Sequence, residues 1–167
     1  MKGTTLIILR GNSGSGKTTI AQQLQKKLGE SVLLISQDTV RREMLAVKDG
    51  LGNPGIELIK QLAQYGNQRV SYVIIEGILR REWYGEMLQE LNEQFAQTFA
   101  YYFDLPFQET LKRHQTKEKA SEFGEQQLRS WWREKDYLDI PNEQLIGSDM
   151  EREAIVTKLL TEMEVDD

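Results

Sequence analysis

The fold class of this 167-residue chain follows from residues 4–19, TTLIILRGNSGSGKTT. The first part, Thr4 to Leu9, is an apolar run with the length of a buried strand, and a glycine-rich turn follows it directly. The turn, Gly11 to Thr18, satisfies the pattern G-x-x-x-x-G-K-[ST]. Apolar residues then recur at helical spacing from Lys17 to Leu28. A turn of this pattern between a strand and a helix is predicted to bind phosphate.

The residues of this turn supply what a triphosphate needs. Glycines allow backbone conformations that other residues avoid, so successive N–H groups can point at phosphate oxygens, and the following helix adds its positive end. Lys17 is expected to contact the β- and γ-phosphates, and the Thr18 hydroxyl is expected to bind Mg²⁺. The predicted ATP-binding residues are Gly11, Asn12, Ser13, Gly14, Ser15, Gly16, Lys17, Thr18 and Thr19.

The rest of the chain alternates short apolar runs with amphipathic helical stretches, which is typical of βαβ units around a parallel sheet. Four further strands are expected, at residues 32–35, 70–75, 98–103 and 144–146. A short helix is expected from Asp38 through Ala46, and KDGLGNPG, Lys48 to Gly55, is expected to be a loop. No repeat, linker or low-complexity segment interrupts the pattern, so residues 1–167 are expected to form one α/β domain.

The composition excludes several classes of protein. The chain has 0 cysteines, which removes disulfides, zinc–thiolate sites and cysteine nucleophiles and fits a reducing cytosol. The formal charge of −5 argues against a broad nucleic-acid surface but leaves room for a local basic cleft. The apolar run Leu6 to Leu9 is far too short for a signal peptide or a membrane span. We therefore expect a cytoplasmic monomer or homodimer with no membrane partner.

Two acidic residues follow predicted strands. Asp38 comes after the second strand, and Glu76 follows the apolar run at residues 72–75. Ligands of open α/β sheets bind beyond the carboxyl ends of the strands. Phosphoryl transfer to an alcohol needs a group that accepts the hydroxyl proton and another that helps to hold the metal. Asp38 suits the first role and Glu76 the second, directly or through water; the alternatives are a helix N-cap for Asp38 and a solvated strand end for Glu76.

Two arginines lie one turn beyond the first of these acids. Arg41 and Arg42 are predicted to hold an anionic or polar group of the acceptor, with a solvated helix face as the alternative. Together with Asp38 and Glu76 they form the predicted acceptor side of the site. The loop Lys48 to Gly55 and the helix after it are expected to complete the acceptor pocket.

Basic residues concentrate ahead of the last predicted strand. They are Lys112, Arg113, Lys117, Lys119, Arg129 and Arg133. A flap with arginines that closes over ATP would neutralise the transferring phosphoryl group and exclude water, and Arg113 is the predicted catalytic residue of this flap. The alternative is a helix with ion pairs at i,i+4 spacing, which Glu109–Arg113 and Glu125–Arg129 both have.

Together these motifs resemble small P-loop kinases, a group with zeta-toxin-like proteins, the kinase domain of polynucleotide kinase and the chloramphenicol phosphotransferase. The residues that carry the resemblance are GNSGSGKTT, Ser36-Gln37-Asp38, Val73-Ile74-Ile75-Glu76-Gly77, and Leu111-Lys112-Arg113-His114 followed by Glu122-Phe123-Gly124-Glu125. The resemblance implies a three-layer P-loop NTPase fold, with a five-stranded parallel sheet in the order 2-3-1-4-5, helices on both faces and a lid near residues 113–133. It also implies that Asp38 is the catalytic base and that Arg113 contacts phosphate.

The leading interpretation is an ATP- and Mg²⁺-dependent kinase that transfers the γ-phosphate to a hydroxyl of a small molecule, such as a nucleoside, a sugar or an antibiotic-like compound. A kinase of nucleic-acid 5′-hydroxyls is the second interpretation, and it would need a basic channel into the site. The third is a non-catalytic ATP-binding switch. The lack of an N-K-x-D base-reading motif and the acid at a strand end both count against a switch.

Overall fold

The computed structural model describes residues 3–115, 125–126, 129, 132, 135–138, 140 and 142–163, without the side chains of residues 113–115. Within this part of the chain, parallel strands form one sheet. They are β1 (Thr5–Gly11), β2 (Val32–Ser36), β3 (Tyr72–Gly77), β4 (Gln97–Phe103) and β5 (Glu143–Ile146). Their order is β2-β3-β1-β4-β5, which confirms the predicted order.

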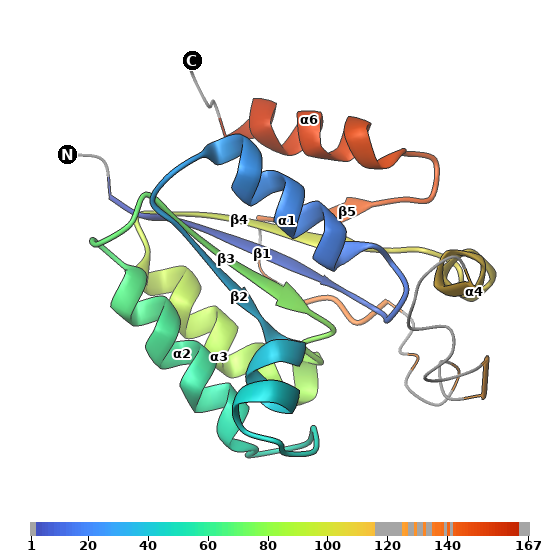
Figure 1. Cartoon of the computed structure of the whole chain (residues 1–167), viewed down its shortest axis with the longest axis horizontal. Coiled ribbons are helices and arrows are strands. Elements are labelled where there is room, and N and C mark those ends of the chain that lie inside the picture. Colours follow the sequence, from blue (N-terminus) through green and yellow to red (C-terminus); the bar gives the residue numbers. More distant parts are fainter. Residues whose placement is uncertain are drawn as a thin grey trace.

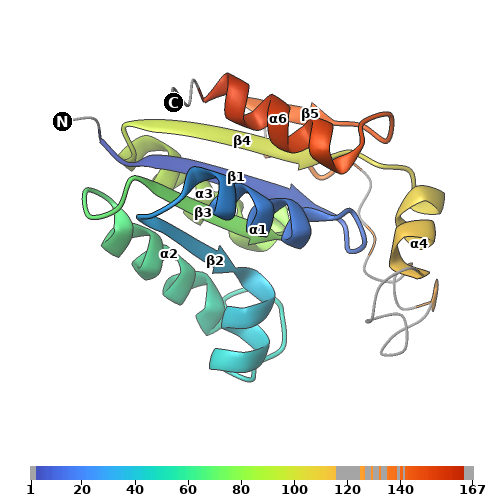
Figure 2. The same cartoon turned by 45° about the horizontal axis from the view of Figure 1, so that its top comes forward.

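Helices cover both faces of the sheet. α1 (Lys17–Leu28) and α6 (Arg152–Glu162) lie on one face, and α2 (Pro54–Gly66) and α3 (Arg81–Gln94) lie on the other (Figure 1). α4 (Phe107–Gln115) stands at the end of the sheet toward which the strands point (Figure 2). The three-layer α/β architecture is therefore confirmed. None of the helices in the described ranges is both long and apolar enough to cross a membrane.

The central strand β1 is buried on both faces because its side chains alternate between two cores. Leu6 and Ile8 pack in the core formed with α2 and α3, while Ile7 and Leu9 pack in the core formed with α1 and α6. A strand buried on both faces carries a continuous apolar run, which made β1 recognisable from the sequence. The two cores hold the end of β1, and the turn that follows it, in a fixed place.

The strand ends differ from the predicted bounds by one or two residues. β1 and β3 both continue past their apolar runs, since the register pairs Arg10 with Gly77. β3 begins at Tyr72 because the amide of Val70 is used in the preceding turn, where it donates to the carbonyl of Gly66 at 3.0 Å. Backbone pairing between strands, more than the hydrophobicity of the residues, therefore determines where β1 and β3 begin and end.

The segment after β2 is helical, as expected, although its helix ends before Ala46. Residues Thr39–Met44 form the π-helix η1, a rare form that is frequent at functional sites. Ala46 has a positive φ of 54°. Asp38 precedes η1 with helical backbone angles, and its side chain caps no backbone N–H. The N-cap alternative for Asp38 is therefore wrong.

Candidate nucleotide and acceptor site

The turn between β1 and α1 forms a tight loop at the tip of the central strand. Gly14 and Gly16 have φ angles of 85° and 93°, in the left-handed region that favours glycine. A Cβ atom on Gly14 would lie 2.7 Å from the carbonyl oxygen of Thr110, so the loop touches α4 directly. The glycines of the pattern thus serve both the curvature of the loop and its close contact with α4.

Lys17 lies within this loop and is 6% exposed. The Lys17 Nζ atom donates to the carbonyl oxygen of Asn12 at 2.9 Å and to Ser15 Oγ at 3.2 Å. Asn12 and Ser15 are buried, whereas Ser13 and Thr19 are partly exposed. These contacts place the ammonium group against the loop backbone, where a phosphate cradled by the loop would meet it.

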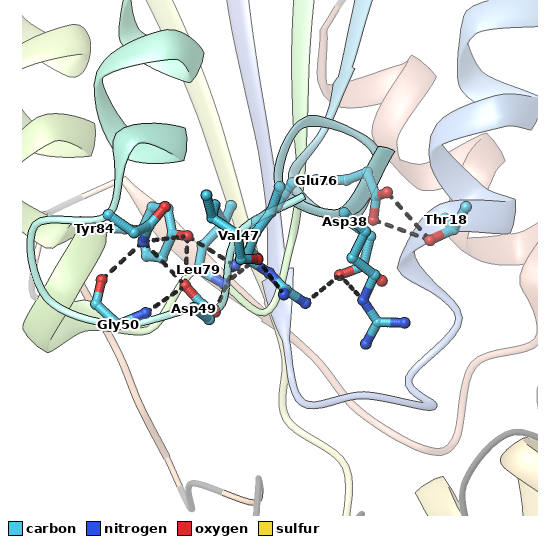
Figure 3. Close-up of polar contacts among 12 residues, drawn as sticks. Thr18, Asp38, Val47, Asp49, Gly50, Glu76, Leu79 and Tyr84 are labelled. Carbon is cyan, nitrogen blue, oxygen red and sulfur yellow. Dashed lines mark hydrogen bonds and ion pairs between the residues drawn. The ribbon is translucent and has the colours of Figure 1, made fainter. Parts of the chain in front are cut away.

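Thr18 and Glu76 come from different elements and meet at the mouth of the loop (Figure 3). The Thr18 hydroxyl lies 3.2 Å from Glu76 Oε1 and 3.1 Å from Glu76 Oε2. Glu76 is 2% exposed, and no Lys or Arg side chain among the described residues forms an ion pair with it. A buried carboxylate without a charged partner is costly, so this site favours a bound cation. The solvated-strand-end alternative for Glu76 is wrong.

Asp38 and the two predicted acceptor arginines form one cluster, which Figure 3 shows between the Thr18–Glu76 pair and Asp49. Arg41 Nη2 lies 3.7 Å and Arg42 Nε lies 4.0 Å from Asp38 Oδ1. The Asp38 side chain is 44% exposed, so it is open to a substrate. Arg41 also donates from Nη1 to the carbonyl oxygen of Val47 at 3.1 Å, while its buried Nε has no hydrogen-bond partner. The structure thus brings all three predicted residues together.

A buried polar cluster beside these residues was missed by the sequence analysis (Figure 3). The Tyr84 hydroxyl donates to Asp49 Oδ1 at 2.7 Å, and Gln37 Nε2 donates to Asp49 Oδ2 at 2.9 Å. Asn53 Nδ2 reaches Asp49 Oδ1 and the Tyr84 hydroxyl, both at 3.3 Å. Burial and the hydrogen bond to Asp49 raise the pKa of Tyr84, so its hydroxyl keeps its proton. The cluster fixes the loop at residues 48–53, the predicted acceptor wall.

Arg10 is a second residue that the sequence analysis missed. Its side chain is 0% exposed, and it lies in β1 immediately before Gly11, the first residue of the glycine-rich turn. The guanidinium donates to Asp136 Oδ2 at 3.0 Å, to Glu143 Oε2 at 3.2 Å and to the carbonyl oxygen of Leu79 at 3.1 Å. Burial lowers the pKa of Arg10, while the two carboxylates oppose that shift. Arg10 therefore ties β1, β5 and the turn after β3 together with two buried or half-buried ion pairs.

The predicted lid is described only in part. Arg129 forms the expected i,i+4 ion pair with Glu125 at 3.2 Å and lies over the ring of Phe107, with 4.3 Å to the ring centroid. The Trp132 ring meets Phe107 edge-on at 5.4 Å, beside a cavity of about 450 Å³ that reaches Asn12. The side chains of Arg113, Lys117, Lys119 and Arg133 lie outside the described residues. The catalytic role of Arg113 stays a prediction.

The sheet order, the glycine-rich loop between β1 and α1 and the helices on both faces define a P-loop NTPase fold. The family described as AAA domain (AAA_33) matches residues 6–136, most of the chain. The chain belongs to this family. The finer resemblance to zeta-toxin-like proteins, polynucleotide kinase and the chloramphenicol enzyme stays a prediction.

Solved structures of similar fold are named as kinases. An APS kinase from Mycobacterium tuberculosis, in complex with AMPPNP and APS, has a TM-score of 0.70 at 16% identity, over 98% of this chain and 99% of that chain. A gluconokinase from Sinorhizobium meliloti 1021 has a TM-score of 0.71 at 14% identity, over 98% and 94%. The shikimate kinase of Acinetobacter baumannii, in complex with shikimate, has a TM-score of 0.64 at 19% identity, over 96% and 93%. At these identities the likeness shows the fold.

A curated relative matches over a short stretch. The uridine kinase of Staphylococcus aureus (strain JH9) is 54% identical over 39 residues, which is 23% of this chain. The match spans 19% of the length of that uridine kinase. The likeness is therefore local.

Proposed function

We propose that this protein is a kinase that uses ATP with Mg²⁺ to phosphorylate a hydroxyl group of a small molecule. The observation that carries the proposal is the contact of the exposed Thr18 with the buried Glu76 beside the loop that holds Lys17. A hydroxyl and a carboxylate at the end of a phosphate-binding loop are suited to a magnesium ion that also binds phosphate oxygens. The names of the structural neighbours and of the uridine kinase support a kinase over a switch.

The residues of the loop would bind and orient the triphosphate. Its backbone amides and the first turn of α1 would surround the phosphates, and Lys17 would exchange its contact with Asn12 for phosphate oxygens. Thr18 and Glu76 would hold Mg²⁺. The ion would supply neutralisation of charge on the β- and γ-phosphates. No group of three or more His, Cys, Asp or Glu side chains in the described ranges is placed to bind a metal, so the phosphates would complete this site.

Asp38 would accept the proton of the acceptor hydroxyl as the new P–O bond forms, while the bond from the γ-phosphorus to the β–γ bridging oxygen breaks and ADP leaves. The Asp38 carboxylate is 44% exposed just beyond the end of β2, and Glu76 lies near the carboxyl end of the neighbouring strand β3. Arg41 and Arg42 are held beside it and would bind a polar or anionic group of the acceptor. Such contacts position the hydroxyl for in-line attack, which is where most of the rate of phosphoryl transfer arises.

A transfer screen with γ-labelled ATP tests this proposal. The acceptors would be nucleosides, sugars, hydroxy acids, aminoglycosides and oligonucleotides with a free 5′-hydroxyl. Lys17→Ala serves as the blank, and Lys26→Ala, a change on the exposed side of α1, serves as the matched control. We expect one acceptor class to be labelled by the wild type and by the control, and no label with Lys17→Ala.

A melting assay with ATP separates binding from transfer. ATP that binds the folded protein alone raises its melting temperature, so the shift should be present in the wild type and nearly absent in Lys17→Ala. An equal shift in both proteins would overturn the assignment of the loop. Wild-type binding without transfer to any acceptor or to water would favour the switch.

A further inference from the structure

Gln37 is a buried amide at the point where β2 and β3 end. The last paired residues of the two strands are Ser36 and Glu76. Immediately beyond this pair, the Gln37 side chain lies in the space between the two chains, where it is 2% exposed. A Cβ atom on Gly77 would lie 2.4 Å from Gln37 Oε1, so the glycine makes room for the amide. The Gln37 side chain therefore packs between the segment after β2, which carries Asp38, and the end of β3, which carries Glu76.

The orientation of this amide is fixed by its partners. Gln37 Oε1 accepts the backbone N–H of Leu79 at 2.9 Å. Gln37 Nε2 donates to Asp49 Oδ2 at 2.9 Å and to the Tyr84 hydroxyl at 3.1 Å. The hydroxyl gives its own proton to Asp49 and can only accept from Gln37. A flipped amide would set an oxygen against a carboxylate and leave Leu79 without an acceptor, so the arrangement is unique.

The turn after Glu76 depends on the same amide. Leu79 is buried and has a positive φ of 45°, a strained conformation for a residue other than glycine. Such strain persists where the surroundings hold the backbone in place. Gln37 holds the amide of Leu79, and Arg10 Nε holds its carbonyl oxygen at 3.1 Å. In the turn that follows the predicted metal ligand Glu76, both the amide and the carbonyl oxygen of Leu79 are therefore held by side chains.

We infer that Gln37 is a positioning residue, which sets the place of Asp38 relative to Glu76 and holds loop 48–53 as the wall of the acceptor site. The inference rests on the proposed function. No other side chain of this length presents one acceptor and two donors at its end. A displacement of the base by about 1 Å can lower the rate by about 10²-fold, so a residue that fixes its position can limit the reaction without touching the substrate.

The test reverses one hydrogen bond of the cluster. In Gln37→Glu the oxygen that accepts from Leu79 is kept, but a second carboxylate faces Asp49. In the double variant Gln37→Glu/Asp49→Asn, the new amide can donate to the new carboxylate, and the bond is restored with its direction reversed. Gln22→Glu, on the exposed face of α1, is the matched control.

For Gln37→Glu we expect kcat to fall by roughly 10²-fold while the KM for ATP stays within about twofold, because the phosphate loop is untouched. The double variant should recover most of the lost kcat, and the control should behave as the wild type. Wild-type kcat in Gln37→Glu, or a double variant at least as slow as Gln37→Glu alone, would overturn the inference.

Hydrogen exchange at the amides of Leu79 and Gly50 keeps the inference testable if no acceptor is found. Both amides donate within the cluster, to Gln37 Oε1 and to Asp49 Oδ1. Faster exchange in Gln37→Glu with recovery in the double variant would support the positioning role, even where the wild type transfers no phosphate and the proposed function fails. Unchanged exchange in Gln37→Glu would overturn the role even if the kinase proposal holds.

Discussion

The hydroxyl of Thr18 lies within hydrogen-bond distance of both carboxylate oxygens of Glu76, at 3.2 and 3.1 Å. A hydroxyl has one proton to donate, so it can satisfy one of these oxygens at a time. The carboxylate is buried and belongs to no ion pair with a basic side chain of the described chain. This arrangement leaves negative charge at the mouth of the phosphate loop, where a divalent cation would be bound.

Glu76→Gln should separate stability from activity. Glu76 is buried and forms no ion pair with a basic side chain of the described residues, so removal of its charge should leave the unliganded protein at least as stable as the wild type in urea. Transfer should fall by roughly 10²–10³-fold, since a preorganised contact to the phosphate charge is lost. The ATP-induced melting shift should no longer increase when Mg²⁺ replaces EDTA. Glu93→Gln, on the exposed side of α3, is the control, and a retained Mg²⁺ effect in Glu76→Gln would refute the metal role.

Asp38→Asn should abolish transfer and leave ATP binding intact. The amide keeps the size of the side chain and an oxygen that can face Arg41 and Arg42, but it cannot accept the hydroxyl proton. We expect kcat to fall by about 10²–10⁴-fold with an unchanged melting shift from ATP and Mg²⁺. The control is Glu43→Gln, an exposed acid on η1. Wild-type turnover in Asp38→Asn would show that this carboxylate is not the base.

The parts of the site that the sequence predicted lie in continuous motifs at strand ends. Lys17 and Thr18 belong to one pattern, and Glu76 follows an apolar run that could only be a buried strand. Parallel strands bring their carboxyl ends to one edge of the sheet, so local signals placed Thr18 and Glu76 at the same edge. The sheet order came with the resemblance to P-loop kinases and is confirmed.

The parts that were missed depend on contacts between residues distant in the sequence. Gln37 and Tyr84 are 47 positions apart, and no spacing or composition connects them. Arg10 follows an apolar strand and could equally have pointed to solvent, because its partner Asp136 is 126 positions away. The π-helical form of η1 also has no signal in TVRREM that distinguishes it from an α-helix. Tertiary packing determines the contact of Gln37 with Tyr84, the burial of Arg10 and the form of η1.

The carboxylate of Glu162 should make stability depend on pH. Burial alone would raise the pKa of Glu162, but hydrogen bonds from Lys158, Tyr101 and Gln144 outweigh burial and lower it. A carboxyl whose pKa is lower in the folded state stabilises the fold above its unfolded pKa, and that stabilisation is lost as the pH falls through the folded pKa.

Glu162→Gln should therefore melt lower than the wild type at pH 7, by roughly 2–4 °C. The difference should shrink as the pH falls from about 5 and vanish once the pH lies below the lowered pKa of the folded state, where the carboxyl is protonated in both states. Calorimetry of both proteins across this pH range measures the difference in melting temperature. A difference that is the same at pH 7 and pH 3 would mean that the charge of Glu162 contributes nothing.

Arg10→Leu should destabilise the protein strongly, because it leaves the carboxylates of Asp136 and Glu143 without the cation they share. Removal of one partner from a buried ion pair costs about 3–5 kcal/mol in the free energy of unfolding, which urea titration resolves. Arg69→Leu, an exposed arginine over the ring of Tyr65, is the control and should change stability by under about 0.5 kcal/mol.

A triple variant decides whether the charge of Arg10 or its hydrogen bonds account for its contribution to stability. Neutralising the partners as well, in Arg10→Leu/Asp136→Asn/Glu143→Gln, removes the unpaired charges. This variant should recover much of the loss even though four hydrogen bonds from the guanidinium are gone. A triple variant as unstable as Arg10→Leu would instead assign the role to those hydrogen bonds. Because Arg10 also holds the carbonyl oxygen of the strained Leu79, the triple variant should regain stability but not the slow exchange of the Leu79 amide.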